Sequence, residues 1–494
     1  MSDLDMLRGG RLADALDETL HFTSSVSDDR ILAGAVSKIN IVHLLMLLKK
    51  GLVKKKDVVA CIEVLDSMPK DLPLRVELED IHMNVEAYVS SKAGDDSGGQ
   101  MNLGKSRNDQ VATAIRMVSK EILLELLDDI IVLERILLEI ARANVETVFP
   151  AYTHLQRAQV ITVSHYLLAY HDAIARDIER LIECYGRVNA SPMGAGAVGT
   201  VILDLDREYV AHFLGFAGIV ENSIDAVTAR DFLVEILSIL SLLMTDIERF
   251  ANEIILWSSS EFSFIEIPDE FASTSSIMPQ KKNAVVAEVI RSKSSIIFGD
   301  LAASIHMMKS LPLGYNLDYQ DLTPKLWDGL KNARMSVQIL GKMLKQIIFK
   351  KDQIEKGIGD ELGAADLANY LSVDSGIPFR KAHHIVGFLV RSAIEKNESF
   401  RKTVTENLGK TARRIIGKEL AIDPAKLDII LDPHKNVESK KTRGGPAPAE
   451  SRRMISDRWQ RIASYSSFVK AKRDSMERSQ IALQKEIKNL KEVK

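Results

Sequence analysis

The sequence predicts an all-α protein, and three observations lead to this fold class. Three long runs contain neither glycine nor proline: residues 106–149, 153–185 and 226–267. Apolar side chains recur within them at helical spacing, as at Leu123, Leu127 and Ile130. No run of alternating apolar and polar residues is long enough to indicate a sheet. We therefore expect a fold built from a few long helices.

The three runs predict helices that pack against several neighbours. At 1.5 Å per residue, the run 106–149 can form a helix of roughly 60 Å. The run 226–267 carries Leu, Ile and Phe on more than one face, so it needs packing partners on several sides. A bundle of three to five such helices leaves apolar faces uncovered. We therefore expect an obligate oligomer.

Glycine clusters divide the chain into three predicted domains. The clusters lie at residues 94–104 and 357–363, which gives domains of 1–107, 108–357 and 358–494. The end of the last domain, 470–494, has eight Lys and Arg against four Asp and Glu, with Leu483, Ile487 and Leu490 at helical spacing. It is typical of a charged terminal helix. The interspersed acidic residues favour a solvated face over a nucleic-acid-binding arm.

The composition of the 494-residue chain excludes several classes of protein. A net charge of −3 gives no basic footprint for nucleic acid, and no uninterrupted apolar stretch of 18 or more residues predicts a membrane span. Two cysteines, Cys61 and Cys184, build neither a disulfide framework nor a cysteine-based zinc site. The first ten residues lack the apolar core of a signal peptide. We expect a cytoplasmic protein without a metal or organic cofactor.

One polar loop carries the residue types that an elimination reaction needs. Residues 274–283 read TSSIMPQKKN and run into an apolar helical pattern. A serine acts as a base only if its alkoxide is stabilised. Lys281, Lys282 and Asn283, at the expected helix start, can supply a positive field for Ser275 or Ser276. A solvated loop with an asparagine cap is the alternative interpretation of this composition.

This loop resembles the signature loop of the fumarase/aspartase superfamily, whose members cleave C–N or C–O bonds and release fumarate. Further segments are similar to those of the argininosuccinate lyases within that superfamily: EDIH at 79–82, GKSRNDQ at 104–110, YTHLQRAQ at 152–159, NSIDAVTARDF at 222–232, YNLDYQ at 315–320 and GG at 444–445. The resemblance runs from about residue 22 to 449. It implies cleavage of argininosuccinate to arginine and fumarate in arginine biosynthesis. It also implies a homotetramer whose active sites combine residues of three chains.

The resemblance also implies roles for individual residues. Ser275 takes the position of the catalytic base, and Lys281 and Asn283 stabilise the doubly negative intermediate. His154 and Glu288 take the positions of a histidine–carboxylate pair, although the sequence does not assign their proton. The remaining substrate-binding positions are Ser25, Arg107, Asn108 and Thr153 for the succinyl carboxylates and Tyr315 and Gln320 for the arginine portion, with Asp29 and Asp80 as acidic contributors. Arg230 fits either the site or an ion pair within the bundle.

Several positions depart from the family pattern. Thr274 replaces a glycine that precedes the serine pair, and a β-branched residue avoids positive φ. Lys105 stands where arginine is common, which turns a bidentate group into a point charge. Ala229, Ala284, Leu317 and Thr323 replace a usual Asp, Pro, Arg and Lys. We expect these changes to affect rate and affinity more than reaction type.

Two alternative functions remain open. The first is adenylosuccinate lyase or another lyase of N-substituted aspartates, which would share the loop but need a different amine pocket. The second is a non-catalytic helical oligomer, because this scaffold has also been recruited as an eye-lens crystallin. The presence of Ser275, His154, Lys281, Asn283 and Glu288 together favours an enzyme.

Overall fold

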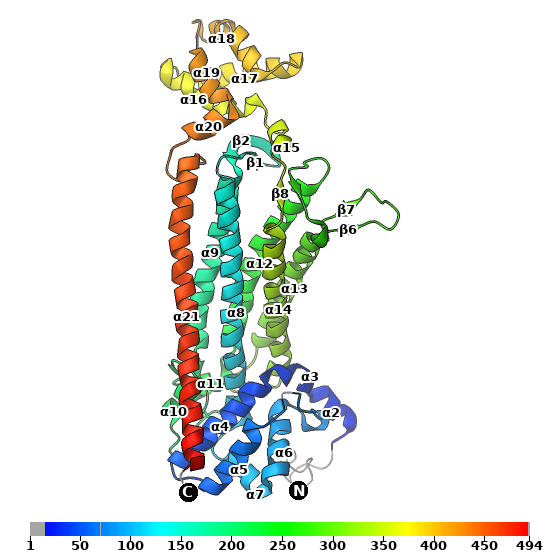
Figure 1. Ribbon diagram of the computed structural model, residues 1–494, viewed down its shortest axis with the longest axis vertical. Helices are drawn as coiled ribbons and strands as arrows, with labels where there is room; N and C mark the ends of the chain where they lie inside the picture. The colour runs from blue at the N-terminus through cyan, green and yellow to red at the C-terminus, as the bar shows by residue number, and fades with distance from the viewer. Residues whose placement is uncertain (1–14, 70, 493–494) are drawn as a thin grey trace.

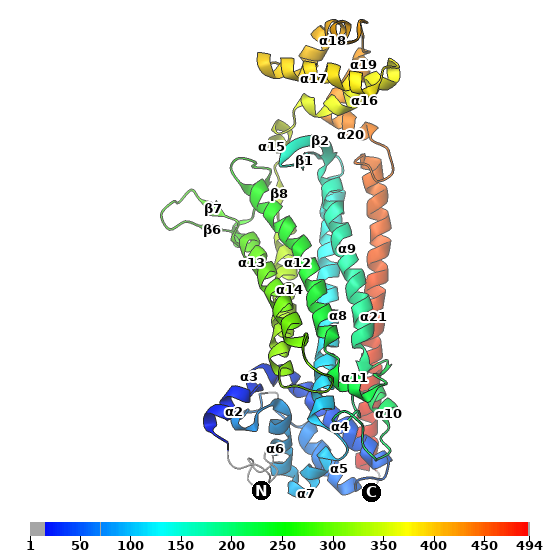
Figure 2. The same cartoon turned by 180° about the vertical axis from the view of Figure 1, so that it is seen from behind.

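The computed structural model of the chain describes residues 15–69 and 71–492 and confirms the all-α fold class. The first ten residues, in which we expected no signal peptide, lie outside the described residues. Figure 1 shows an elongated helical bundle with a small helical unit at each end, and Figure 2 shows the same arrangement from behind.

The N-terminal unit packs around one apolar helix, α4. Its helices are α2 (Asp17–Thr23), α3 (Val26–Asp29), α4 (Ala33–Lys49), α5 (Lys55–Asp66), α6 (Ile81–Ala93) and α7 (Asp95–Gly99). The helical stretch Val26–Lys49 is long and apolar enough to cross a membrane, but 72% of its most apolar window is buried inside the structure. Such burial is what a core helix of a globular unit requires.

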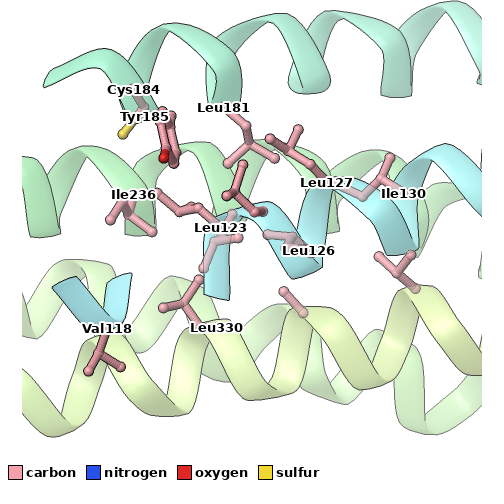
Figure 3. Packing of buried hydrophobic residues seen from close by; sticks show 14 of the residues in the cluster. Val118, Leu123, Leu126, Leu127, Ile130, Leu181, Cys184, Tyr185, Ile236 and Leu330 are labelled. Carbon is pink, nitrogen blue, oxygen red and sulfur yellow. The ribbon is translucent and has the colours of Figure 1, made fainter. Parts of the chain in front are cut away.

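Five long helices form the central bundle: α8 (Arg107–Ala143), α9 (Val163–Val188), α12 (Asp231–Ser258), α13 (Val285–Met308) and α14 (Tyr319–Leu344). They pack through aliphatic side chains, and Figure 3 shows Leu126 and Leu127 of α8 among Leu181 of α9, Ile236 of α12 and Leu330 of α14. The 37 residues of α8 give it a length of about 55 Å. Positions at its two ends therefore lie far apart.

Short helices and two-stranded sheets connect the bundle helices. They are β1 (Val148–Thr153), β2 (Gln156–Thr162), β3 (Ala190–Ser191), α10 (Arg207–Phe213), β4 (Gly218–Ile219), α11 (Ser223–Thr228), β5 (Ile265–Glu266), β6 (Ser273–Thr274), β7 (Lys282–Asn283) and β8 (Ile348–Phe349). The prediction of a helix from residue 153 was wrong for its first ten residues, because β1 and β2 form an antiparallel hairpin there. The helix α9 begins only after the hairpin, at Val163.

The C-terminal unit lies at the opposite end of the bundle from the N-terminal unit (Figure 1). Its helices are α15 (Lys351–Lys356), α16 (Ala364–Asp374), α17 (Phe379–Lys396), α18 (Phe400–Ile416), α19 (Pro424–Leu431) and α20 (Pro433–Ser439). The 45-residue α21 (Pro448–Glu492) then returns along the bundle. The division into three domains stays a prediction. α21, which we assigned to the C-terminal domain, packs against α8 and α9 of the central bundle.

Polar and apolar contacts fix α21 along its length. Near its start, Arg458 Nε donates to Asp172 Oδ1 of α9 at 2.8 Å, and Tyr465 donates to Glu179 at 2.9 Å. Near its end, Leu483 and Ile487 lie beside helices α4 and α5 of the N-terminal unit, and only 1% and 4% of their surfaces are exposed. The charged terminal helix that the sequence predicts is therefore solvated on one face and buried on the other.

Replacing Leu483 or Ile487 by Ala should lower the Tm, because loss of a buried aliphatic side chain costs about 2–5 kcal/mol. Ile481, which is 62% exposed on the same helix, supplies the control. Its replacement by Ala should change stability by no more than about 0.5 kcal/mol. Equal Tm values for all three variants would show that the end of α21 contributes nothing to the fold.

Candidate functional site

The structure divides the predicted site residues into three groups along the bundle. Ser25, Arg107, Asn108, Tyr315 and Gln320 lie at the N-terminal end. The β6–β7 hairpin, which projects from the side of the bundle, carries Ser275, Lys281 and Asn283, whereas Thr153 and His154 lie on the β1–β2 hairpin (Figure 1). A single chain does not bring the three groups into one site.

An acidic cluster surrounds Arg107, the first residue of α8. Arg107 Nε lies 3.1 Å from Asp80 Oδ2, and its Nη1 lies 3.7 Å from Glu79 Oε2. Asp80 also caps α6 by accepting from the Met83 backbone N–H at 2.8 Å. Burial raises the pKa of both Glu79 and Asp80. Within one chain, Arg107 is thus an ion-pair partner as well as a candidate carboxylate-binding group.

Ser25 and Asp29 complete this cluster. Ser25 Oγ donates to Asp29 Oδ2 at 2.5 Å, and Ser25 N–H donates to the carbonyl oxygen of Glu79 at 2.9 Å. Glu79 has a φ of 64°, which costs a non-glycine residue about 1–3 kcal/mol. Burial, together with the nearby Asp80 charge and despite the bond from Ser25, raises the pKa of Asp29 to about 6. The cluster suits a cationic ligand group.

Tyr315 lies beside the acidic cluster and a buried arginine. Burial raises its pKa to about 12, and its charged neighbours include Arg230, Asp80 and Asp29. Arg230 is fully buried and has its guanidinium carbon 5.0 Å from the centre of the Tyr319 ring. Within the described residues of one chain Arg230 has no ion pair, and its Nη1 donates to the carbonyl oxygens of Val227 at 3.3 Å and Ala229 at 3.2 Å. Gln320 follows Tyr319 at the start of α14.

Asp109 organises the same end of the bundle, and sequence analysis did not single it out. It forms a capping box with Ser106 at the start of α8. Its Oδ2 also accepts backbone N–H groups from Gly194 at 3.0 Å and Gly196 at 2.9 Å. Asn108 Nδ2 donates to the Ala197 carbonyl of the same glycine-rich loop at 3.1 Å. The Ser-x-x-Asp spacing is the local signal that could have identified the cap.

The tip of the β6–β7 hairpin presents Ser275 in a distinctive environment. Its Oγ accepts the backbone N–H of Ile277 at 3.2 Å and of Met278 at 3.0 Å. Two donors on one hydroxyl oxygen stabilise negative charge there. Ser276 is exposed, and its side chain makes no hydrogen bond within the described part of the chain. The two serines therefore differ in their hydrogen bonding, and of the two only the Ser275 oxygen accepts backbone N–H groups among the described residues.

The stem of this hairpin is a short antiparallel ladder. Thr274 pairs with Lys282 in extended backbone, so its β-branched side chain meets no steric conflict in this conformation. Lys282 Nζ lies 2.8 Å from Glu266 Oε1 and 2.7 Å from Asp269 Oδ1. Lys281 and Asn283 line a cleft of about 480 Å³ beneath the hairpin. Lys281 is exposed and carries no ion pair within the described residues.

His154 lies at the exposed tip of the β1–β2 hairpin. His154 and Leu155 are the two turn residues, with φ values of 54° and 57°. Hairpin turns of this kind normally use Asn and Gly, so the conformation carries strain. Aromatic packing supports the hairpin from below, where Phe149 meets Trp257 at 5.2 Å between ring centres. A cavity of about 600 Å³ adjoins the turn and includes Leu155 and Arg157.

Glu288 lies on the first turn of α13 and is exposed. In the described part of a single chain, no hydrogen bond or ion pair joins it to His154. Thr323 is buried and bonds its hydroxyl to the Tyr319 carbonyl at 3.1 Å. Lys325, the nearby lysine, lies 3.3 Å from Asp300 of α13. Lys325 therefore faces a helix of the bundle rather than replacing the absent lysine at 323.

Comparison with known families gives two matches. A family described as "Lyase" matches residues 10–299, and one described as "Argininosuccinate lyase C-terminal" matches residues 361–438. The argininosuccinate lyase of Methanothrix thermoacetophila is 41% identical over 96% of this chain and 96% of its own. That of Methanocaldococcus jannaschii is 39% identical over 95% of this chain and 97% of its own.

Solved structures support the same relationship. An EDDS lyase in complex with formate superimposes with a TM-score of 0.87 at 26% identity, covering 93% of this chain and 92% of its own. A class II fumarase from Schistosoma mansoni gives a TM-score of 0.69 at 18% identity, covering 82% of this chain and 90% of its own. At that identity the fumarase shows a shared fold alone.

The acidic cluster predicts pH-dependent binding of a guanidinium ligand such as arginine. Asp29 is ionised above a pKa of about 6, so the Kd for arginine should fall as the pH rises from 5 to 7. Asp29→Asn should weaken binding at pH 7 and flatten this dependence. Asp28→Asn, which changes the exposed neighbouring carboxylate, should preserve it. Calorimetric titration measures both; an unchanged pH dependence in Asp29→Asn would exclude Asp29 from binding.

Proposed function

Because this chain belongs to the argininosuccinate lyase family of the fumarase/aspartase superfamily, we infer that it is a carbon–nitrogen lyase. It cleaves argininosuccinate reversibly to arginine and fumarate, a step of arginine biosynthesis. Identity of about 40% over nearly the whole chain supports this activity over adenylosuccinate lyase. The geometric observation that carries it is the Ser275 oxygen, which two backbone N–H groups contact at the tip of the catalytic loop.

Ser275 is the proton-abstracting base in this proposal. The reaction removes a proton from the carbon next to a carboxylate, and the C–N bond then breaks with its electron pair on nitrogen. The proton acceptor must be an alkoxide, which is costly in water. The N–H groups of Ile277 and Met278 lower that cost by placing partial positive charge at the oxygen.

The other loop residues and the histidine pair serve the same step. Lys281 and Asn283 stabilise the doubly negative carboxylate that forms after proton loss, which is electrostatic work of the oxyanion-hole type. His154, oriented by Glu288, transfers a proton to or from the reacting groups. Because these two residues are not joined within one chain, their pairing requires a contact between chains.

The N-terminal cluster binds the two ends of the substrate. The succinyl carboxylates bind to Ser25, Arg107 and Asn108 of this cluster and to Thr153 from the β1–β2 hairpin of another chain. The guanidinium of Arg107 can hold one carboxylate bidentately. Tyr315 and Gln320 bind the arginine portion beside the acidic cluster. The carboxylates of Asp29 and Asp80 complement a cationic guanidinium there.

A homotetramer with shared sites accounts for the separation of the three groups. Apolar residues remain exposed along α13, including Val289 at 54%, Phe298 at 65% and Ile305 at 47%. Exposed apolar surface of this extent favours an interface between subunits. Packing of bundles in opposite directions can place the N-terminal cluster of one chain near His154 of a second and Ser275 of a third. We also propose a cytoplasmic location.

Ser275→Ala should lower kcat by roughly a thousandfold or more, because removal of the base raises the free energy of the transition state without altering the fold. Ser276→Ala is the matched control and should retain most of the activity. The assay follows fumarate by its absorbance, with argininosuccinate and adenylosuccinate as parallel substrates. Fumarate from adenylosuccinate alone would overturn the proposed substrate, and near-normal turnover of Ser275→Ala would remove it as base.

Mixing two inactive variants tests the shared sites. Ser275→Ala and His154→Asn proteins, unfolded and refolded together, assemble at random. Each site then draws its serine and histidine from independent chains, so about one site in four should contain both, and activity should return to about a quarter of wild type. Each variant refolded alone is the control. Background activity in the mixture would place both residues of a site on one chain.

A further inference from the structure

A buried asparagine contacts both sides of the turn that presents Arg107 and Asn108. Asn40 lies on α4 and is 1% exposed. Its Oδ1 accepts a hydrogen bond from Gln110 Nε2 at 3.2 Å and a second from Lys105 Nζ. Lys105 precedes the turn and Gln110 follows it. One amide oxygen of the N-terminal unit therefore fixes both flanks of the start of α8.

The groups that face Lys105 come from every helix packed around it. They are His43 of α4, Cys61 of α5, His82 and Glu86 of α6, and Asp109 of α8. Burial lowers the pKa of both His43 and His82 to about 3, so they are neutral near pH 7. Neither ring nitrogen of His82 has a hydrogen-bond partner in the described residues. Glu86 and Asp109 provide the negative charge in the cluster.

In this environment the charge of Lys105 changes with pH in the range of an enzyme assay. Burial lowers the pKa of Lys105 to about 8, whereas Glu86 and Asp109 act in the opposite direction. An arginine, which the family resemblance leads one to expect at this position, would stay protonated throughout the pH range of an enzyme assay. A lysine loses its charge at higher pH, and the neutral amine then makes a weaker hydrogen bond to Asn40 than the charged ammonium does.

We propose that Lys105 and Asn40 are positioning residues, which act through the start of α8 to hold Arg107 and Asn108 toward the substrate. The inference rests on the proposed function. In the proposed reaction, neither Lys105 nor Asn40 touches the reacting atoms. Without the buried Asn40 oxygen, the two donors on opposite sides of the turn lose their common acceptor, and a buried donor left without a partner is destabilising.

Three variants test the proposal by their pH profiles. Lys105→Arg should remove the loss of substrate affinity, seen as a rise in KM, that begins near pH 8 in the wild type. Asn40→Asp keeps the acceptor oxygen and adds a negative charge, so the same loss should move up by about one pH unit or more. Asn40→Leu removes the acceptor and should raise KM roughly tenfold at pH 7, with kcat changed much less.

The control is Asn252→Asp, which adds the same charge on the exposed face of α12, remote from Lys105. It should leave the KM profile unchanged. If KM rises at the same pH in wild type, Lys105→Arg and Asn40→Asp, the proposal is wrong. If Asn40→Leu fails to fold, the Lys105→Arg and Asn40→Asp profiles still decide.

A measurement without substrate separates this proposal from the proposed function. A lysine whose pKa is lowered by folding binds fewer protons in the native than in the unfolded state between pH 8 and its ordinary pKa near 10.4. The difference in Tm, wild type minus Lys105→Arg, should therefore increase as the pH rises from 8 to 10. A wild type that releases no fumarate from argininosuccinate would refute the proposed function. A flat Tm difference would refute the environment inferred for Lys105.

Discussion

The length of the bundle helices is the constraint on which the rest of the molecule depends. α8 alone spans about 55 Å and separates the Arg107 cluster at one end from the His154 hairpin beyond the other. The proposed active site, which uses both, therefore requires residues from more than one chain. The exposed apolar side chains of α13 provide a surface by which subunits can assemble.

Within each end, a few buried polar groups convert helix packing into a defined arrangement of side chains. Asp109 joins the start of α8 to the glycine-rich loop at residues 194–200, and Asn40 joins it to the N-terminal unit. Buried polar groups are costly unless satisfied, so these contacts tolerate little displacement. The β6–β7 hairpin is different, because its ion pairs through Lys282 are partly exposed and worth less. The N-terminal end of the bundle, which we propose binds the substrate, is thus held more firmly than the loop of the proposed base.

The helices could be predicted because local patterns determine them. The absence of Gly and Pro and the spacing of Leu123, Leu127 and Ile130 specify α8 without knowledge of its partners. The β1–β2 hairpin could not be predicted, since its His154–Leu155 turn lacks the Asn and Gly that normally mark such a turn. Motif resemblance predicts Ser275 as a candidate base. The bonds of Asp109 to Gly194 and Gly196 join residues 85 and 87 positions apart, so they leave no local signature in the sequence.

The return of α21 has a consequence for the order in which the protein can be completed during synthesis. The helix that covers part of α8, α9 and the N-terminal unit follows all of them in the chain, so it leaves the ribosome after them. Until Leu483 and Ile487 are available, the apolar surface of α4 and α5 that they cover is open to solvent. A nascent chain with its first 440 or so residues made therefore carries an uncovered apolar strip, which favours aggregation or chaperone binding. Synthesis of the 45 residues of α21 therefore determines when this apolar surface can be covered.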